Sequence, residues 1–282
     1  MNGKELLKSG KPGEALASLQ QEVRGNAADP KLRLFLFQLL CVLGQWDRAL
    51  NQLAVLADMG SEEQMLSRIF EPVVRCESLR AQIFTGGRSP ILFGEPESWM
   101  SLLIQANSLV AGGDFKGAAS LRGLALEEAP AVSGQADGAA FEWIMDADPR
   151  LGPMMEAIIE GTYYWVPFMR VKRVIIEAPT DLRDLVWAPA HFLWVNGGEV
   201  FGHIPVRYPG SEKQADGPIQ LARRTEWVEH PSGYTLGLGQ RLLSTDTTDL
   251  PLLECRTMEM TLESPAPEPS AAEPSSNPTS HG

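Results

Sequence analysis

The sequence predicts an α+β protein in which a module of helical repeats is followed by a β-rich domain. In the first half, residues of one type recur at a fixed spacing and apolar residues follow a helical period. In the second half, apolar and polar residues alternate as they do in strands. A last segment rich in Pro, Ser and Ala has no apolar period. We therefore expect a helical-repeat domain over residues 1–130, a β-rich domain over 138–263 and a tail without fixed structure over 264–282.

The repeat is visible as a spacing of 34 residues. Gly10 and Ala15 recur as Gly44 and Ala49. A third copy begins at Gly113, which follows Gly44 by two periods and one residue. This pattern resembles the tetratricopeptide repeat, in which two antiparallel helices pack closely. We expect a small residue late in the first helix and an Ala early in the second helix to allow this close approach. The expected packing positions are Gly10, Ala15, Gly44, Trp46, Ala49, Gly113, Phe115 and Ala118.

Two further helix starts are expected between the second and third copies. Ser61 followed by Gln64 predicts a capping box. Pro96 after Glu95 predicts a helix with Pro at its first position. A plain helical bundle without repeats is the alternative interpretation. A stack of helix pairs leaves a concave face that binds a peptide or a helix, so the repeat predicts a protein-binding function.

The second half contains several short strands. Asn196-Gly197 lies between two apolar runs and is a strong hairpin signal. Gly152-Pro153 predicts a brief helix that ends at Gly161. Short strands with few helices predict a curled antiparallel sheet or a small barrel. The expected strands are Phe141–Met145, Tyr163–Phe168, Val171–Ile176, His191–Val195, Glu199–Ile204, Thr225–Val228, Tyr234–Leu236 and Leu253–Leu262.

The composition excludes several classes of function. The formal net charge is −12, from 36 acidic and 24 basic residues, so general nucleic-acid binding is not expected. No apolar run reaches the roughly 18 residues that a membrane-spanning helix needs, and the N-terminus lacks a signal-peptide pattern, so we expect a cytoplasmic protein. Cys41, Cys76 and Cys255 lie far apart, which favours three reduced thiols over a disulfide framework or a zinc site.

No pattern of catalytic residues emerges. His191 and His203 are expected to oppose each other across the predicted hairpin, with Glu199 nearby, and this arrangement suits a metal less well than a structural role. Asp146 with Asp148, and likewise Asp246 with Asp249, are interpreted as surface turns. The sequence has no nucleophile elbow and no phosphate loop. We therefore expect no enzyme activity, no cofactor and no metal. A ligand-sensing or hydrolytic β domain with a helical regulatory arm stays open as the alternative.

Arginines placed among aromatic residues are the notable polar feature of the second half. Such arginines form buried pairs with carboxylates or form a recognition patch, because Arg, Trp and Tyr dominate binding hot spots. A structural role is favoured for each arginine singly, but not for all of them together. The candidates for partner binding are Arg170, Arg183, Asp184, Trp187, Arg207, Tyr208, Arg224 and Trp227.

Several strings in the chain resemble the ImpE/TagJ family. This resemblance implies an accessory protein of the bacterial type VI secretion system without known catalysis. It also implies that the protein binds the small sheath subunit TssB and is linked in this way to the ClpV ATPase, which recycles contracted sheath. Together with the groove expected from the repeats, it predicts that a helix of TssB is the segment bound. The resemblance covers nearly the whole chain except the tail. The matching strings are Asp146–Pro153, Gly161–Phe168, Pro179–Trp187, Ile204–Glu212, Arg224–Trp227, Gly239–Arg241 and Asp246.

Overall fold

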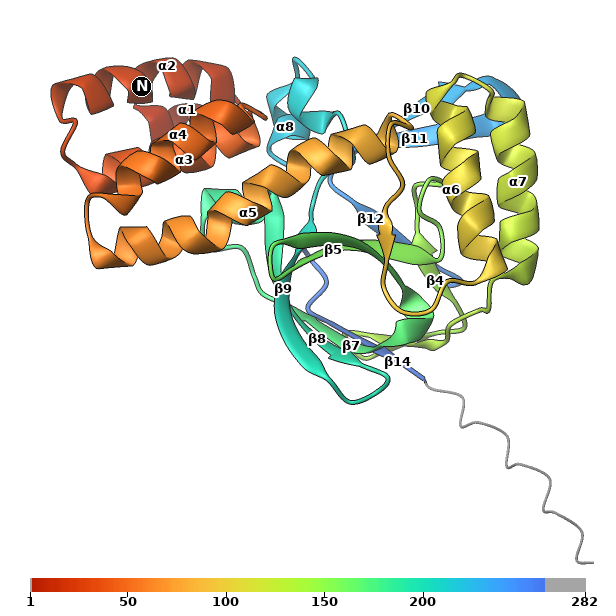
Figure 1. Ribbon diagram of the computed structural model, residues 1–282. Coiled ribbons are helices and arrows are strands. Elements are labelled where there is room, and N and C mark those ends of the chain that lie inside the picture. Colours follow the sequence, from red (N-terminus) through yellow and green to blue (C-terminus); the bar gives the residue numbers. More distant parts are fainter. Residues whose placement is uncertain (1, 262–282) are drawn as a thin grey trace, which may run out of the picture.

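The helices of the first half form antiparallel pairs. The structure is a computed structural model that describes residues 2–261, so the expected tail at 264–282 lies outside the described residues. Figure 1 shows α1 to α4 at one end of the molecule, the long α5 running from them across the sheet, and α6 and α7 at the other end. The helices are α1 Gly3–Lys8, α2 Pro12–Gly25, α3 Pro30–Val42, α4 Trp46–Ala57, α5 Ser61–Phe84, α6 Ser98–Ala111, α7 Phe115–Glu128 and α8 Gly217–Gln220.

The expected repeat positions define the helical hairpins, but the glycines act differently from the expectation. Each glycine lies in the turn after the first helix and not inside that helix. Ala15, Ala49 and Ala118 are fully buried early in each second helix, as expected for a close crossing. Gly10, with a φ of +73°, and Gly44, with +63°, adopt a left-handed conformation that glycine tolerates best. The glycine is therefore needed for the turn, whereas the Ala sets the distance between the helices.

Two expected helix starts differ from the structure. Helix α5 begins at Ser61 itself, after Gly60, and no side chain caps it. Helix α6 begins at Ser98, with Glu97 as its N-cap, and not at Pro96. Both differences move a boundary by one or two residues, where sequence signals are weakest.

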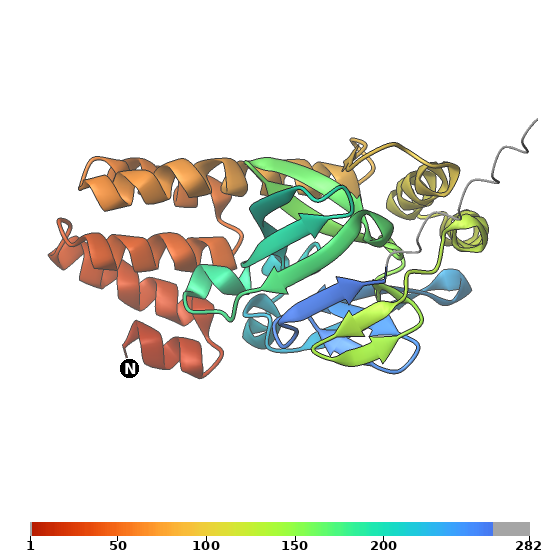
Figure 2. The ribbon, with the colours of Figure 1, turned by 90° about the horizontal axis from the view of Figure 1, so that it is seen from below.

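The second half forms a nine-stranded sheet together with two smaller sheets. The order in the large sheet is β1-β6-β5-β9-β8-β7-β14-β2-β3, and the smaller sheets are β10-β11 and β13-β12-β4. All pairs are antiparallel except β1 with β6, and over residues 2–261 the strands do not close into a barrel. Figure 2 shows the sheet between the helical pairs. The strands are β1 Ile91–Leu92, β2 Gly134–Ala136, β3 Ala139–Phe141, β4 Ile144–Asp146, β5 Met154–Ile159, β6 Thr162–Pro167, β7 Val171–Ile176, β8 Trp187–Trp194, β9 Glu199–Pro205, β10 Thr225–His230, β11 Tyr234–Gly239, β12 Leu242–Thr245, β13 Asp249–Pro251 and β14 Thr257–Met260. Short 3-10 helices are η1 Phe168–Arg170, η2 Leu182–Leu185, η3 Ser211–Lys213 and η4 Pro231–Gly233.

The brief helix expected from Gly152 to Gly161 is wrong, because this segment contains strand β5. All six residues of β5 are buried. Met154 and Ile158 belong to the core shared with the helices, whereas Met155 and Ile159 belong to the core enclosed by the sheet. A strand covered on both faces has no polar alternation, so its apolar run resembles that of a buried helix.

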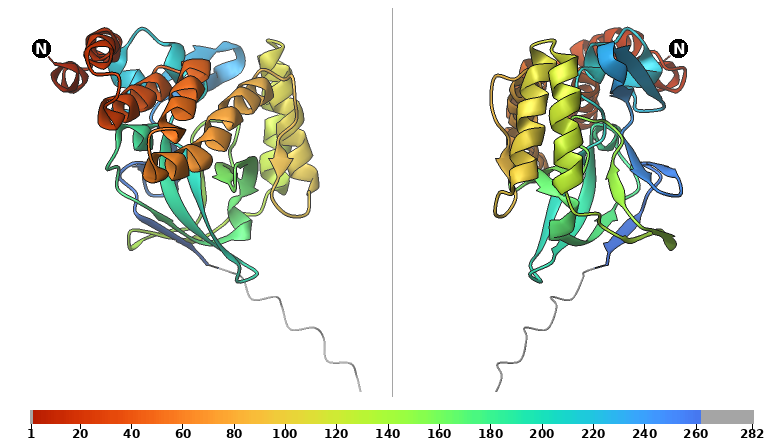
Figure 3. Two further views of the ribbon diagram at one scale, coloured as in Figure 1. Left: turned by 60° about the vertical axis from the view of Figure 1, so that its left-hand side comes forward. Right: turned by 90° about the vertical axis from the view of Figure 1, so that its right-hand side faces the viewer.

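The helical repeats and the sheet share one hydrophobic core. Phe37 and Phe70 from the helices lie in the same buried cluster as Trp165 and Trp187 from the strands. A second cluster fills the inside of the curled sheet. The pair α6–α7 contributes Trp99 and Leu103 to the shared core, and its other end packs against Tyr234 of β11. Figure 3 shows this pair beside the β10–β11 ribbon. The proposed domain limits therefore stay a prediction, since strand β1 lies within the first domain and pairs with the sheet of the second.

Candidate functional site

A buried ion cluster joins helix α5 to the sheet; it consists of Arg80, Asp146, Glu156 and Arg241. Glu156 lies on the face of β5 that packs toward α5, and both of its oxygens accept hydrogen bonds from Arg80, at 2.5 and 2.9 Å. Arg241 is fully buried and contacts both Asp146 and Glu156. Tyr163 also donates to Glu156 at 2.5 Å. Each carboxylate of the cluster is thus neutralised inside the fold.

The two carboxylates of the cluster have opposite pKa shifts. Burial alone would raise the pKa of Glu156, but Arg80 and Arg241 lower it to about 2. Asp146 has Arg241 as its cationic partner and lies near Asp148, and burial raises its pKa to about 6. The cluster therefore holds one carboxylate that stays ionised and one that titrates near neutral pH.

Arginines of the second half also bind the ends of the repeat helices. Arg207 donates to the carbonyl oxygens of Cys41 and Val42, at the end of α3, at 3.3 and 2.6 Å. Arg223 donates to the carbonyl oxygens of Leu7 and Lys8 at the end of α1, at 2.8 and 3.0 Å. The last carbonyls of a helix lack partners within the helix and carry partial negative charge. The repeats are therefore docked on the second half through their helix ends.

Four of the predicted partner-binding residues are buried in this framework. Trp187 donates to Glu77 at 2.8 Å, and Tyr208 packs under the Arg241 guanidinium. Asp184 accepts backbone hydrogen bonds from Thr180 and Asp181. These residues, together with Arg207, are at most 4% exposed. Asp184, Trp187, Arg207 and Tyr208 therefore present no surface to a partner in this structure, because their polar atoms satisfy groups within the fold.

The other four candidates are partly exposed and contact separate parts of the fold. Arg170 pairs with Glu97 before α6, at 3.2 Å. Arg183 lies over the ring of Phe70, at 4.6 Å from its centroid. Arg224 lies directly before strand β10, and Trp227 lies within it. Partner binding at Arg170, Arg183, Arg224 and Trp227 stays a prediction.

Sequence reasoning missed Arg80 and Glu156 and misassigned Asp146 and Asp148. Asp146 and Asp148 are each 1% exposed, so they do not belong to a surface turn. Asp148 accepts two hydrogen bonds from the Arg150 guanidinium, at 2.8 and 2.6 Å. A single Glu in the apolar run of β5 was the available signal, because a buried carboxylate requires a cationic partner. The identity of that partner, 76 positions away in the chain, had no sequence signal.

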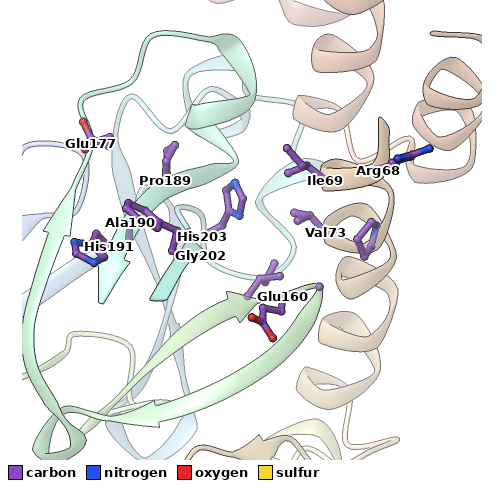
Figure 4. A pocket seen from close by; sticks show the side chains of 14 residues that line it. Arg68, Ile69, Val73, Glu160, Glu177, Pro189, Ala190, His191, Gly202 and His203 are labelled. Atoms are coloured by element: carbon purple, nitrogen blue, oxygen red, sulfur yellow. The ribbon is translucent and has the colours of Figure 1, made fainter. Parts of the chain in front are cut away.

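An open pocket lies on another part of α5; we call it the α5–sheet pocket. It has a volume of about 430 Å³ and lies between α5 and strands β5, β8 and β9. Figure 4 shows Ile69 and Val73 of α5 facing Pro189 and His203 of the sheet. Ile69 is 45% exposed, and Phe201, which also lines the pocket, is 75% exposed. Exposed apolar side chains on both walls of a pocket are typical of a binding site.

The two histidines of the hairpin line this pocket without opposing each other. In the register of β8 and β9, His203 pairs with Pro189, and His191 pairs with Phe201. His191 stacks on Phe201 and lies 3.1 Å from Glu199. Burial, together with the charge of Arg183, lowers the pKa of His203 to about 4. Within residues 2–261, no group of three or more His, Cys, Asp or Glu side chains is placed to hold a metal ion.

Comparison with known proteins agrees with this architecture. Residues 6–65 match the tetratricopeptide repeat, and residues 138–259 match the ImpE protein family. An X-ray crystal structure of a protein from Vibrio parahaemolyticus superposes with a TM-score of 0.83 at 24% identity, covering 93% of this chain and 98% of that chain, which shows the fold alone. None of the helices in the described part of the chain is long and apolar enough to cross a membrane.

The fold thus defines a tetratricopeptide-repeat protein with an ImpE domain. The chain is 41% identical over 259 residues to the type VI secretion system accessory component TagJ of Pseudomonas aeruginosa, covering 92% of this chain and 91% of TagJ. The chain belongs to the ImpE/TagJ family.

Proposed function

We propose that this chain is a non-catalytic accessory component of a type VI secretion system that binds an amphipathic helix of the sheath subunit TssB in the α5–sheet pocket. The accessory role is supported by the similarity to TagJ over nearly the whole chain. The pocket is the observation that carries the binding role, since it offers exposed apolar residues on two walls. We further propose that the protein acts in the cytoplasm and is linked through TssB to ClpV-driven recycling of the sheath.

The floor of the pocket favours a helix over an extended strand. Strand β8 is paired on both sides, with β7 and β9. Gly202 and His203 of β9 pair with β5 as well as with β8. At these positions the floor presents side chains, because the backbone there is paired with strands on both sides. A partner that enters must satisfy its own backbone hydrogen bonds, and a helix does so.

The charges around the pocket favour a helix with basic flanks. Glu160 and Glu177 line the pocket, and among its lining residues Arg68 is the one Lys or Arg, beside two histidines. Glu199 adds a further carboxylate beside His191. Charge complementarity of this kind increases the association rate and selects among partners. The expected partner helix thus has an apolar stripe and basic residues beside it.

The sequence predicted a binding groove on the repeat itself, whereas the pocket in the structure lies between a helix of the first half and the sheet. A groove within the repeat itself, between α3 and α5, has a volume of only about 140 Å³ and is lined by Leu34, Leu56 and Leu66 among others. The α5–sheet pocket is larger, and only one of its walls is a repeat helix. We therefore place the proposed helix between the repeat and the sheet.

The non-catalytic part of the proposal is supported by the state of the buried carboxylates. Asp146, Asp148 and Glu156 are each held by an arginine and are at most 1% exposed. A general acid or base must be within hydrogen-bond reach of a substrate, and these groups are enclosed by the fold.

Titration of peptides that cover each TssB helix, followed by fluorescence polarisation, tests the proposal. We expect one peptide to bind with a Kd in the micromolar range, because it must also become ordered. Ile69→Asp and Phe201→Asp should each weaken binding about tenfold or more, since apolar anchors carry most of the energy. Leu124→Asp is the matched control, because Leu124 of α7 is also half exposed and lies outside the pocket.

The absence of binding to TssB would contradict the proposal. Failure of all TssB peptides and of the intact sheath dimer to bind below about 100 µM would exclude the adaptor role in this form. A ligand-sensing role would then become the better interpretation, because about 430 Å³ is also a size that small molecules occupy. A thermal-shift screen of metals and metabolites measures that alternative directly.

A further inference from the structure

The β10–β11 ribbon, residues 225–239, has an open edge that the pocket and the proposed helix do not use. Most other sheet edges in residues 2–261 are short. The large sheet ends in β1, with two residues, and in β3, with three; the small sheet ends in β13 and β4, with three residues each. Strand β10 has six residues and pairs only with β11. Natural proteins keep exposed edges short, so a long open edge is a feature that needs a reason.

The hydrogen bonds of β11 show which backbone groups face the open edge. In an antiparallel pair, residues alternate between those bonded to the neighbouring strand and those whose N–H and C=O groups point away. The amides of Gly237 and Gly239 donate away from β10, to Asp148 Oδ2 and Ser211 Oγ, both at 2.8 Å. Their cross-strand partners Trp227 and Thr225 must therefore point their own N–H and C=O groups outward.

By the same alternation, Glu229 also points its backbone groups outward. The backbone groups of Thr225, Trp227 and Glu229 accept or donate no hydrogen bond within the described part of the chain. The edge of β11 is different, because Asp148, Ser211 and the Tyr208 amide cover it. The ribbon is thus closed on one side and open on the other.

Two ring contacts connect the ribbon to the rest of the fold. His230 stacks on Phe115 of α7, with ring centroids 4.4 Å apart, and Trp227 lies 5.6 Å from the Tyr208 ring. Figure 3 shows the ribbon next to α6 and α7. An edge that is already ordered loses little entropy when a partner strand binds.

The side chains along the edge are apolar at the centre and acidic around it. Trp227 and Val228 are 39% and 40% exposed, and they lie on opposite faces of the ribbon. Glu226 and Glu229 flank them. Arg224 contacts Asp216 and Glu226, which leaves that end with one net negative charge, and Glu229 adds another. A strand that pairs here meets apolar contacts in the middle and carboxylates on both sides.

We propose that β10 binds an extended segment of a partner protein, which adds a strand to the ribbon and has basic residues around a central apolar residue. Backbone hydrogen bonds from Thr225, Trp227 and Glu229 would supply the affinity, and Glu226 and Glu229 would select basic side chains. A second copy of this chain fits less well. With Trp227 opposite Trp227, the two Glu226 carboxylates become diagonal neighbours, and each chain has a net charge of −12.

The test uses the full chain and a labelled octapeptide of alternating lysine and valine, measured by fluorescence polarisation. The matched control peptide is N-methylated at alternate amides, which keeps the charge and removes the pairing edge. We expect the unmodified peptide to bind about tenfold more tightly than the control, since several backbone hydrogen bonds are lost. A peptide with glutamate in place of lysine should not bind.

Protein variants locate the site. Trp227→Pro removes the outward N–H without breaking a bond to β11, and it should weaken binding about tenfold, whereas Trp227→Tyr should change binding less than about threefold. Equal binding of the N-methylated peptide, or unchanged binding by a folded Trp227→Pro variant, would overturn the proposal. Dimerisation that depends on Trp227 would also overturn it, in favour of self-pairing. If Trp227→Pro does not fold, the N-methylated peptide on the unmodified chain decides the question.

Discussion

Helix α5 contacts two regions of opposite character. Toward its C-terminal end, Glu77 pairs with Arg80 of the buried ion cluster, where every charge has a partner and no residue is more than 7% exposed. Toward its N-terminal end, Met65 and Ile69 are exposed to 66% and 45% beside the α5–sheet pocket. One helix therefore combines a structural end with an end available for binding. The difference teaches that, in this protein, buried charge pairs hold the architecture, whereas the exposed apolar surface of α5 has no structural partner and is where we propose that the helix binds.

The largest expected effect comes from removing a charge of the buried cluster. Arg80→Ala should lower the free energy of unfolding by about 3–5 kcal/mol, because the buried Glu156 then loses one of its two guanidinium partners. Arg75→Ala on the same helix is the control. Arg75 pairs with Glu71 at 2.8 Å, but both side chains are about half exposed or more, so its loss should cost at most about 1 kcal/mol. Chemical denaturation of the two variants measures the contrast, and equal losses would contradict it.

A pH-dependent effect of intermediate size is expected at His203. Its pKa is lowered to about 4 by burial and by Arg183, so the folded protein holds this imidazole neutral where the unfolded chain binds a proton. Stability should therefore be complete above about pH 6.5 and fall as the pH decreases from 6.5 toward 4, by at most about 1.4 kcal/mol per pH unit from this residue.

The variant His203→Gln separates this residue from Asp146, whose raised pKa of about 6 acts in the same pH window with the opposite sign. The folded protein binds the Asp146 proton before the unfolded chain does, so Asp146 adds stability as the pH falls from about 6 toward 4. Removing the imidazole of His203 should therefore lower the slope of stability against pH between 6.5 and 4 in thermal melts. The pKa of Glu156, about 2, acts in a lower window, since its stabilising contribution is lost only as the pH falls from about 4.5 toward 2. An unchanged slope between pH 6.5 and 4 would show that His203 has the same pKa in the folded protein as in the unfolded chain.

The smallest expected effect on stability lies at the pocket wall. Ile69→Asp should change the free energy of unfolding by no more than about 0.5 kcal/mol, because the side chain is 45% exposed and packs on one side only. Val73→Asp, four residues later on the same helix, should instead be strongly destabilising, because Val73 is 2% exposed. A large loss of stability for Ile69→Asp would mean that the pocket wall is structural, and it would remove the distinction between the two ends of α5.

The helical hairpins were predictable because their signals are local. The recurrence of Gly10 with Ala15 as Gly44 with Ala49 indicated where each turn and each crossing lies, and in the structure both alanines are fully buried. The β8–β9 hairpin was equally predictable from Asn196-Gly197, since the short turn between Trp194 and Glu199 needs a residue in the left-handed conformation, which Gly197 adopts. The resemblance to the ImpE/TagJ family is likewise confirmed by comparison with TagJ.

Contacts between residues far apart in the chain decided the nature of strand β5 and the partners of the buried charges. The strand β5 was mistaken for a helix because burial on both faces removed its alternation, and that burial exists only once α5 and the curled sheet lie on either side of it. The role of Arg207 was also undecided by the sequence, because its sequence neighbours suit a surface patch as well as a buried pair. Its contact with the end of α3 exists only in the packed fold.

The sequence by itself therefore determined the repeat, the change to strands and the family, since these depend on residues within a few turns or on whole motifs. Only the tertiary structure decided that Arg80 meets Glu156, that Arg207 binds the end of α3 and that a pocket opens beside Ile69. The physical reason is that a charge or an apolar side chain specifies the kind of environment it needs. Which distant segment supplies that environment depends on how the whole chain packs.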